Sequence, residues 1–285
     1  MSIDQEISGA EIILQALKDQ EVDTIFGYPG GAVLPIYDAL FGQNFLKHVL
    51  VRQEAGAVHA AEGYARSSGK VGVLLVTSGP GVTNVVTGLT DALMDSIPIV
   101  CISGQVPSHL IGTDAFQECD TTGITRPCTK HNYLVKDVSK LSETIHEAFE
   151  IARSGRPGPV LIDVPKDVQF AKSTYVRKSE VTFKSHRIKS GSKDINRDFI
   201  ETLVDHIKKS KKPIFYVGGG CLNSGPQASH ELMKLVQLTN IPITTTLHGL
   251  GCYPGEDSKS LGMLGMHGTY EANLAMNKCD LMINV

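Results

Sequence analysis

The sequence predicts an α/β protein, with a doubly wound parallel sheet followed by a second, incomplete α/β series. Two observations support this fold class. Strand and helix patterns alternate along the chain, and residues 71–76 are apolar almost throughout, as in a strand buried on both faces. The 285 residues suffice for two domains of ordinary size. We therefore expect right-handed crossovers and helices on both faces of the sheet.

The first series runs from residue 8 to about residue 165. Ser8 and Glu11 have the spacing of a capping box, and apolar residues then recur on one helical face as far as Asp19. Further helices are predicted at 32–41, 55–66, 81–94 and 139–153, and strands at 24–27, 48–51, 71–76, 97–102 and 159–164. The stretch between 103 and 138 shows no regular pattern and is expected to be irregular.

A linker is predicted at 171–194, where Lys, Ser and Thr dominate and only a weak strand pattern occurs near 181–183. It separates predicted domains at 1–170 and 195–285. In the second domain we expect helices at 194–209, 226–238 and 270–277, strands at 213–217, 241–245 and 281–285, and a glycine turn at 218–220. The last strand has the pattern of a buried central strand, so this domain is expected to be incomplete.

Composition argues against several functional classes. The net charge is −3 and the basic residues are scattered, so the sequence has no basic patch that would bind nucleic acid or a membrane surface. The amino-terminal segment lacks the pattern of a signal peptide, and no apolar run approaches 18 residues. The six cysteines lack the spacing of a disulfide framework or zinc site, so no metal ligand is predicted. Free thiols are typical of a reducing compartment, so a cytoplasmic location is expected.

Glu54 is placed where an apolar strand ends and a small-residue helix begins. Ligands of open α/β sheets bind beyond the carboxyl ends of the strands, so this carboxylate could serve chemistry as well as the helix dipole. Glycine-rich turns at 27–32, 77–84 and 218–220 also follow strands; each is either an ordinary turn or a close approach to a ligand. Two roles are also open for His267 and for the pair Phe116 and Gln117. Each could have a structural role only, or could line a ligand pocket.

Seven segments, in this order, resemble the catalytic large subunit of acetolactate synthase, or acetohydroxyacid synthase, a thiamine diphosphate enzyme family. They are residues 26–31, 52–57, 77–81, 112–118, 156–160, 163–167 and 265–269. Together they extend over nearly the whole chain. The resemblance implies that the first domain binds the pyrimidine of thiamine diphosphate. It also implies that the second is the start of a Rossmann-like, FAD-binding central domain.

The resemblance implies that pyruvate is decarboxylated and condensed with pyruvate or 2-oxobutyrate, giving 2-acetolactate or 2-aceto-2-hydroxybutyrate for valine, leucine and isoleucine biosynthesis. It also implies Mg²⁺, with ligands outside this chain, and FAD with no net redox role. The expected partners are further copies, as a homodimer or higher homo-oligomer with a shared active site, and a small regulatory subunit. Because the diphosphate-binding half is absent, this chain alone is expected to be inactive.

The resemblance also assigns residues to roles. Glu54 is the implied catalytic acid, which hydrogen-bonds N1′ of the aminopyrimidine and relays a proton. The implied thiamine diphosphate contacts are Gly30, Gly31, Ala32, Glu54 and Gln117. The substrate pocket would comprise Gly31, Ala32, Phe116, Gln117 and, at its access channel, Lys166. FAD would contact Arg156, Gly218, Gly219, Gly220, Thr246, Leu247, His248, Leu264, Gly265, Met266, His267 and Gly268.

Other interpretations stay open. Another thiamine diphosphate enzyme, of the pyruvate oxidase or sulfoacetaldehyde acetyltransferase type, would share this build, although segments 114–118 and 265–269 favour the synthase. A non-catalytic cofactor-binding or assembly module is the alternative from a different class, and the reading frame beyond Val285 would distinguish it from the enzyme. A plain dinucleotide oxidoreductase is less well supported, because its glycine fingerprint is not found.

Overall fold

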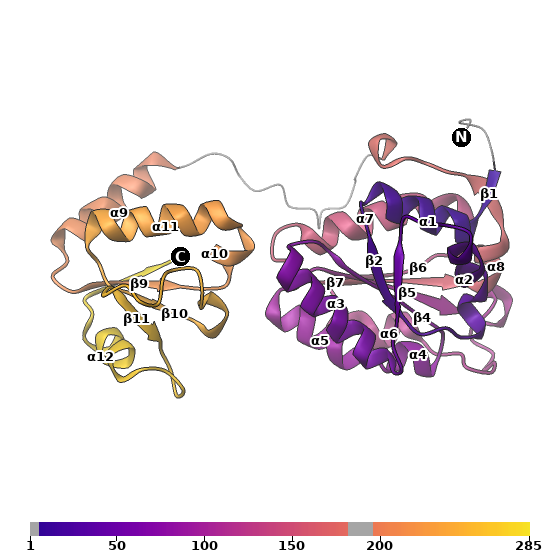
Figure 1. Cartoon of the computed structure of the whole chain (residues 1–285), viewed down its shortest axis with the longest axis horizontal. Coiled ribbons are helices and arrows are strands. Elements are labelled where there is room, and N and C mark those ends of the chain that lie inside the picture. The colour runs from indigo at the N-terminus through magenta and orange to yellow at the C-terminus, as the bar shows by residue number, and fades with distance from the viewer. Residues whose placement is uncertain (1–5, 182–195) are drawn as a thin grey trace. The chain divides into compact units, whose positions relative to one another are not determined.

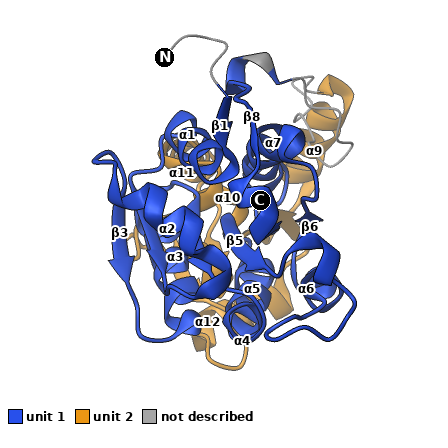
Figure 2. Ribbon diagram, turned by 90° about the vertical axis from the view of Figure 1, so that its right-hand side faces the viewer, with its two compact units in different colours: residues 1–191 blue, residues 192–285 orange. Residues whose placement is uncertain are grey.

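The computed structural model describes residues 6–181 and 196–285, and the chain divides into two compact units, residues 1–191 and 192–285 (Figures 1 and 2). Both are α/β units with parallel sheets, which confirms the predicted fold class. Within the described ranges, no helix has both the length and the apolar character needed to cross a bilayer.

A six-stranded parallel sheet forms the centre of the first unit. Its order is β3 (Lys47–Leu50), β2 (Thr24–Gly27), β4 (Gly72–Val76), β5 (Ile99–Gln105), β7 (Pro159–Pro165) and β6 (His131–Leu134). Successive apolar side chains point to opposite faces. Val73 and Leu75 belong to one buried cluster, whereas Leu74 and Val76 belong to another. The sheet is therefore buried on both faces, as Figure 2 shows by the helices around it.

Helices cover the two faces in separate groups. They are α1 (Gly9–Asp19), α2 (Leu34–Phe41), α3 (Glu54–Ser68), α4 (Pro80–Thr83), α5 (Val86–Asp95), α6 (Thr121–Thr125), α7 (Leu141–Arg153) and α8 (Lys166–Phe170). The apolar sides of α1, α2 and α7 contribute to one buried cluster, and those of α3 and α5 to the other. The predicted capping box is confirmed, because Glu11 N donates to Ser8 Oγ at 3.2 Å and Ser8 N donates to Glu11 Oε2 at 2.8 Å.

Some elements differ from the prediction. The single helix expected at 81–94 is divided into α4 and α5, and the stretch expected to be irregular contains α6 and β6. All four residues of β6 are only partly buried at the sheet edge, so they lack the apolar run that reveals a central strand. The helix expected from residue 32 begins at Leu34, after a short 3-10 turn at Gly31–Val33.

A two-stranded antiparallel ribbon joins the two ends of the first unit. Strand β1 (Glu6–Ser8) pairs with β8 (Lys172–Thr174), with Glu6 opposite Thr174. The beginning of the predicted linker at 171–194 is therefore folded onto the first unit, because its backbone is hydrogen-bonded to β1. Residues 182–183 of the weak predicted strand lie outside the described residues.

The second unit contains a four-stranded parallel sheet, in the order β11 (Ser260–Met263), β10 (Ile243–Thr245), β9 (Pro213–Val217) and β12 (Leu281–Asn284). Its helices are α9 (Arg197–Lys209), α10 (Gly220–Asn223), α11 (Pro226–Thr239) and α12 (Tyr270–Lys278). Figure 1 shows α9 and α11 on one side of the sheet and α12 on the other. Among the described strands, β12 pairs only with β9 and buries only Ile283. That it is the central strand of a larger sheet stays a prediction.

In each unit the strand order reverses beside the first strand of the parallel sheet. In the first unit, β3 lies on one side of β2, and β4 and β5 lie on the other, so the switch falls between β2 and β4. In the second unit, β10 and β11 lie on one side of β9 and β12 on the other. A crevice forms beyond the carboxyl ends of the strands at such switch points, and ligands of doubly wound sheets bind there.

Candidate functional site

The turn at residues 77–81 follows β4 at the switch point of the first unit. Ala32 N donates to Thr77 Oγ1 at 3.2 Å, which ties the loop after β2 to this turn. A Cβ on Gly30 would lie 2.5 Å from the Thr77 side chain, whereas one on Gly31 would meet no atom within 4 Å. Gly30 is thus required by packing, and Gly31 borders open space.

Glu54 lies beside this turn at the start of α3. The residue is only 8% exposed, and Asn84 Nδ2 donates to its Oε2 at 2.9 Å. A Cβ on Gly81 would lie 3.8 Å from Glu54 Oε1. Gln53 caps α3, because its Oε1 accepts from Gly56 N at 3.2 Å. Since Gln53 caps the helix, the side chain of Glu54 is available for another role.

The loop from Val106 to Asp120 lies against the same turn. Gly79 has a φ of 57°, and a Cβ there would lie 2.6 Å from the carbonyl oxygen of Gln117, so only glycine fits. Phe116 is 89% exposed, and Gln117 is also exposed. The predicted residues Gly30, Ala32, Glu54 and Gln117 are therefore all gathered around residues 77–81.

The carboxylate of Glu118 stabilises this loop internally. It accepts hydrogen bonds from Gly112 N and, at 3.1 Å, from Ala115 N. These backbone donors, Gly112 first, lower the pKa of Glu118 below its ordinary value. At the start of the loop, Ser108 N donates to Asp167 Oδ1 at 2.9 Å. Hydrogen bonds thus fix the loop near its start, through Asp167, and in its exposed part, through Glu118.

Lys166, the predicted access-channel residue, is the first residue of α8 and is partly buried. From the same short helix, Gln169 Nε2 donates to the carbonyl oxygens of Ala32 at 2.7 Å and Val164 at 2.9 Å. Gln169 is fully buried, and its Oε1 has no hydrogen-bond partner among the described residues. Helix α8 therefore positions the loop after β2. No role was predicted for Gln169, which lies in no distinctive pattern, or for Asn84, which ends the glycine-rich turn at 77–84 but has no local signal for a bond to Glu54.

The predicted FAD residues of the second unit follow three neighbouring strands. Gly218–Gly220 follow β9, Thr246–His248 follow β10, and Leu264–Gly268 follow β11. A Cβ on Gly219 would lie 3.0 Å from His248 Cβ, so the first two turns are in contact. Thr245 Oγ1 is buried and has no hydrogen-bond partner in the part of the chain that the structure describes.

Asn273 of α12 fixes the third of these loops. Its Oδ1 accepts from Gly265 N at 2.9 Å, and its Nδ2 donates to Gly265 O at 3.0 Å. Gly265 has a φ of 100°, which suits glycine. Met266 is 90% exposed and His267 is also exposed, so two side chains of this loop project from the protein.

Arg156 is placed differently from the other predicted FAD residues. It belongs to the first unit and precedes β7, at the amino-terminal edge of the sheet. Its Nε donates to Ser96 Oγ at 2.7 Å, and its Nη2 donates to the carbonyl oxygens of Leu93 at 3.0 Å and Met94 at 2.7 Å. These bonds satisfy the last carbonyls of α5, a role that stabilises a helix end.

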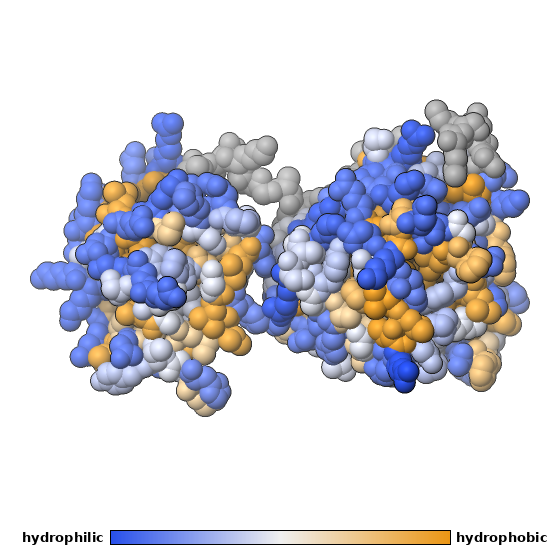
Figure 3. Space-filling model, in the orientation of Figure 1, coloured by the Kyte–Doolittle hydropathy of each residue, from blue (hydrophilic) through white to orange (hydrophobic). Residues whose placement is uncertain are grey.

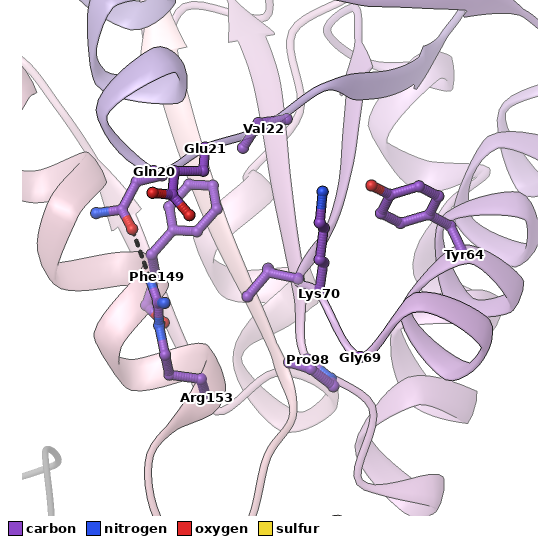
Figure 4. A pocket seen from close by; sticks show the side chains of 10 residues that line it. Gln20, Glu21, Val22, Tyr64, Gly69, Lys70, Pro98, Phe149 and Arg153 are labelled. Carbon is purple, nitrogen blue, oxygen red and sulfur yellow. Dashed lines mark hydrogen bonds between the residues drawn. The ribbon is translucent and has the colours of Figure 1, made fainter. Parts of the chain in front are cut away.

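A hollow of about 200 Å³ lies at the opposite, amino-terminal edge of the first sheet (Figure 4). Its two cations are already bound. Lys70 Nζ lies 2.5 Å from Asp23 Oδ2, and Arg153 Nη2 donates to Gln20 Oε1 at 2.5 Å. With these charges paired, and with none of the predicted site residues in its lining, the hollow does not compete with the crevice at Glu54.

Comparisons with known proteins give matches for both units of the chain. The family description "Thiamine pyrophosphate enzyme, N-terminal TPP binding domain" matches residues 7–124, and "Thiamine pyrophosphate enzyme, central domain" matches residues 200–285. The chain is 52% identical to the chloroplastic acetolactate synthase of Arabidopsis thaliana, over 98% of this chain and 41% of the relative.

Two further relatives come from a bacterium and a yeast. The acetolactate synthase large subunit of Haemophilus influenzae is 49% identical over 99% of this chain and 48% of its own length. The mitochondrial acetolactate synthase catalytic subunit of Saccharomyces cerevisiae is 51% identical over 98% of this chain and 41% of its own length. The chain thus spans somewhat less than half the length of the curated relatives it matches.

Proposed function

Since the chain belongs to the thiamine pyrophosphate enzymes and is homologous to acetolactate synthase large subunits, we propose that it forms part of such a synthase. The whole protein would decarboxylate pyruvate and join the two-carbon unit to pyruvate or 2-oxobutyrate. The observation that carries this proposal is the buried carboxylate of Glu54, bound by Asn84 beside an open glycine turn at the switch point.

The residues at this crevice fit thiamine diphosphate. When bound, this cofactor supplies a carbon nucleophile that adds to 2-oxo acids and allows the loss of CO₂. Glu54 would hydrogen-bond N1′ of the aminopyrimidine and exchange a proton with it. Asn84 occupies Glu54 Oε2 and so fixes the orientation of the carboxylate, while Gly81 keeps the space beside Oε1 open. Gly31 leaves room for the thiazolium.

The proposed substrate pocket lies next to Glu54. Gly31, Ala32 and Gln117 surround the turn after β4, and Phe116 adds an exposed aromatic surface. Lys166 would attract the carboxylate of the 2-oxo acid toward the pocket, because a cation at the mouth of a cleft raises the local concentration of an anion.

FAD is proposed for the second unit. Glycine turns at the carboxyl ends of β9 and β11 allow backbone to approach a dinucleotide, and β9 lies at the switch point. The buried hydroxyl of Thr245, which has no partner among the described residues, would be satisfied by a polar group of the ligand. Arg156 stays a predicted FAD residue, and its guanidinium binds the end of α5 in the first unit.

Replacing Asn273 by Ala tests this site. The variant should weaken FAD binding about tenfold, because the loop at 264–268 loses its two hydrogen bonds to the side chain of residue 273. Flavin fluorescence titration of the full-length protein measures the affinity. The matched control is Asn277→Ala, on the exposed part of the same helix. Equal FAD affinity in both variants would contradict a flavin site at this loop.

The remaining expectations concern cofactors, partners and location. We propose Mg²⁺ bound by ligands outside this chain, a homo-oligomer with a shared active site, and a small regulatory subunit. On the face shown in Figure 3, apolar side chains form separate patches on each unit. The exposed apolar side chains of the first unit include Phe41, Leu50 and Met94, and such exposure supports association. The cytoplasmic location stays a prediction, since two relatives are named chloroplastic and mitochondrial.

A single assay tests the proposed activity. Full-length protein with thiamine diphosphate, Mg²⁺ and FAD should convert pyruvate to 2-acetolactate, detected as acetoin after acid decarboxylation. Pyruvate consumption that yields acetate or acetyl phosphate instead would favour a pyruvate oxidase type of enzyme. Absence of any pyruvate consumption, with all cofactors bound, would favour the non-catalytic module.

A further inference from the structure

A buried polar cluster lies beneath the end of the loop that carries Phe116 and Gln117. It consists of Ser103 and Gln105 on β5, Asp163 on β7 and Thr121 on α6, each at most 2% exposed. Ser103 Oγ donates to Asp163 Oδ1 at 2.7 Å, and Gln105 Nε2 donates to Asp163 Oδ2 at 2.9 Å. The mechanism proposed above uses none of these side chains.

The amide of Gln105 connects this cluster to the loop. Its Nε2 also donates to the carbonyl oxygen of Cys119 at 2.9 Å, and its Oε1 accepts from Val106 N at 2.9 Å. All neighbours on the nitrogen side are acceptors, and the neighbour on the oxygen side is a donor. When Asp163 is ionised, a reversed amide would place its oxygen against the carboxylate, so Asp163 helps to determine which way the amide points.

The loop leaves β5 at Val106 and is bound again at Cys119, so the single amide of Gln105 contacts both of its ends. Gln117 lies two residues before Cys119, and its carbonyl oxygen is the group that packs over Gly79. Movement at Cys119 would therefore displace Gln117 and Phe116 from the turn at residues 77–81.

We propose that Asp163 is a positioning residue: by orienting the Gln105 amide, it holds the loop 106–120 against the turn beside Glu54 and so sets the affinity for the 2-oxo acid. This inference rests on the proposed function, because the loop is taken to line the substrate pocket. Asp163 is buried and would not touch substrate or cofactor. It acts through Gln105 and the carbonyl of Cys119.

The test compares Asp163→Leu with Asp163→Asn in the full-length protein. The leucine variant removes the acceptor for Gln105 and should raise KM for pyruvate about tenfold, the factor that corresponds to about 1.4 kcal/mol of lost positioning, with kcat changed less than threefold. The asparagine variant can still accept from Gln105 and donate to Ser103, so its KM should stay within threefold of the wild type.

The matched control is His146→Leu. His146 is fully buried and bonded to Gln20, at 3.0 Å, but it lies on α7, which packs on the opposite face of the sheet. This variant should lower thermal stability without changing KM. An unchanged KM in Asp163→Leu, or an equal rise in His146→Leu, would overturn the proposal. If Asp163→Leu does not fold, Gln105→Met replaces it, with the same expected rise in KM.

Hydrogen exchange separates failure of this inference from failure of the proposed function. Amides of residues 106–120 should exchange faster in Asp163→Leu than in His146→Leu, measured without substrate by mass spectrometry. If the two variants show this difference but the wild-type protein forms no acetolactate, the proposed function is refuted and the anchoring role stays intact. Equal exchange of the loop in the two variants would refute the anchoring role itself.

Discussion

Replacing Glu54 by Gln in the full-length protein is expected to slow hydrogen–deuterium exchange at C2 of bound thiamine diphosphate by about 100-fold or more, with the fold retained. Glutamine keeps the length of the side chain and can still accept from Asn84, but it cannot exchange a proton with N1′. Exchange is followed by acid quench and NMR, and circular dichroism checks the fold.

The control for this variant is Glu62→Gln. Glu62 is also on α3 and is 6% exposed, but it is bonded to His59 within the helix rather than placed at the switch point. Burial raises the pKa of Glu62 above its ordinary value. Near-normal C2 exchange in Glu54→Gln, or equal losses in both variants, would show that Glu54 has no specific role in proton transfer.

The stability of the first unit should fall with rising pH because of Asp163. Burial raises the pKa of this carboxyl from 3.8 to about 7, although donors on Ser103 and Gln105 oppose the shift. The other titratable groups that face it are Asp120, Cys101 and Cys119. Asp120 raises the pKa of Asp163 further, and burial raises the pKa of both thiols, so these stay neutral.

The free energy of unfolding falls with rising pH because the folded form binds a proton more tightly than the unfolded chain does. Between pH 4 and 7 the folded form keeps the proton that the unfolded chain has released, so this contribution to the free energy of unfolding falls by up to about 1.4 kcal/mol per pH unit. It is fully present below pH 4 and lost above pH 7. Asp163→Asn removes this dependence. Urea unfolding at pH 5 and pH 8 should show that the stability of the variant rises relative to the wild type by about 100-fold in the unfolding constant between the two pH values.

A second substitution provides the control for pH. The pKa of Asp23 is lowered to about 2, mainly by its bond to Lys70, so it stays ionised throughout this range. Asp23→Asn should therefore change stability by the same amount at pH 5 and pH 8. Parallel pH dependence in the wild type and Asp163→Asn would show that Asp163 does not titrate in this window.

The sequence predicted those elements whose signal is local. Strands β4 and β7 are buried on both faces and read as apolar runs, and the capping box marks the start of α1. Strands β6 and β11 escaped prediction because none of their residues is fully buried, and α8 because it has only five residues. Burial patterns of short or edge elements depend on neighbours far along the chain.

In the candidate site too, residues with a local signal could be predicted, whereas pairs of residues far apart in the sequence could not. Glu54 could be predicted because it begins the helix that comes after a strand, but its partner Asn84 lies 30 residues away. Gln105 and Asp163 are 58 residues apart and meet only because β5 and β7 are neighbours in parallel register. Pairings of this kind follow from the sheet order, which no local pattern specifies.

The antiparallel ribbon of β1 and β8 brings the first and last described strands of the first unit side by side. A unit whose ends are adjacent can tolerate rearrangement of chain order, because a short connection joins them without strain. Linking residue 174 to residue 6 and opening the chain in an exposed loop should therefore preserve the six-stranded sheet. The crevice beside Glu54 would then be portable as a self-contained module, independent of where its sequence begins.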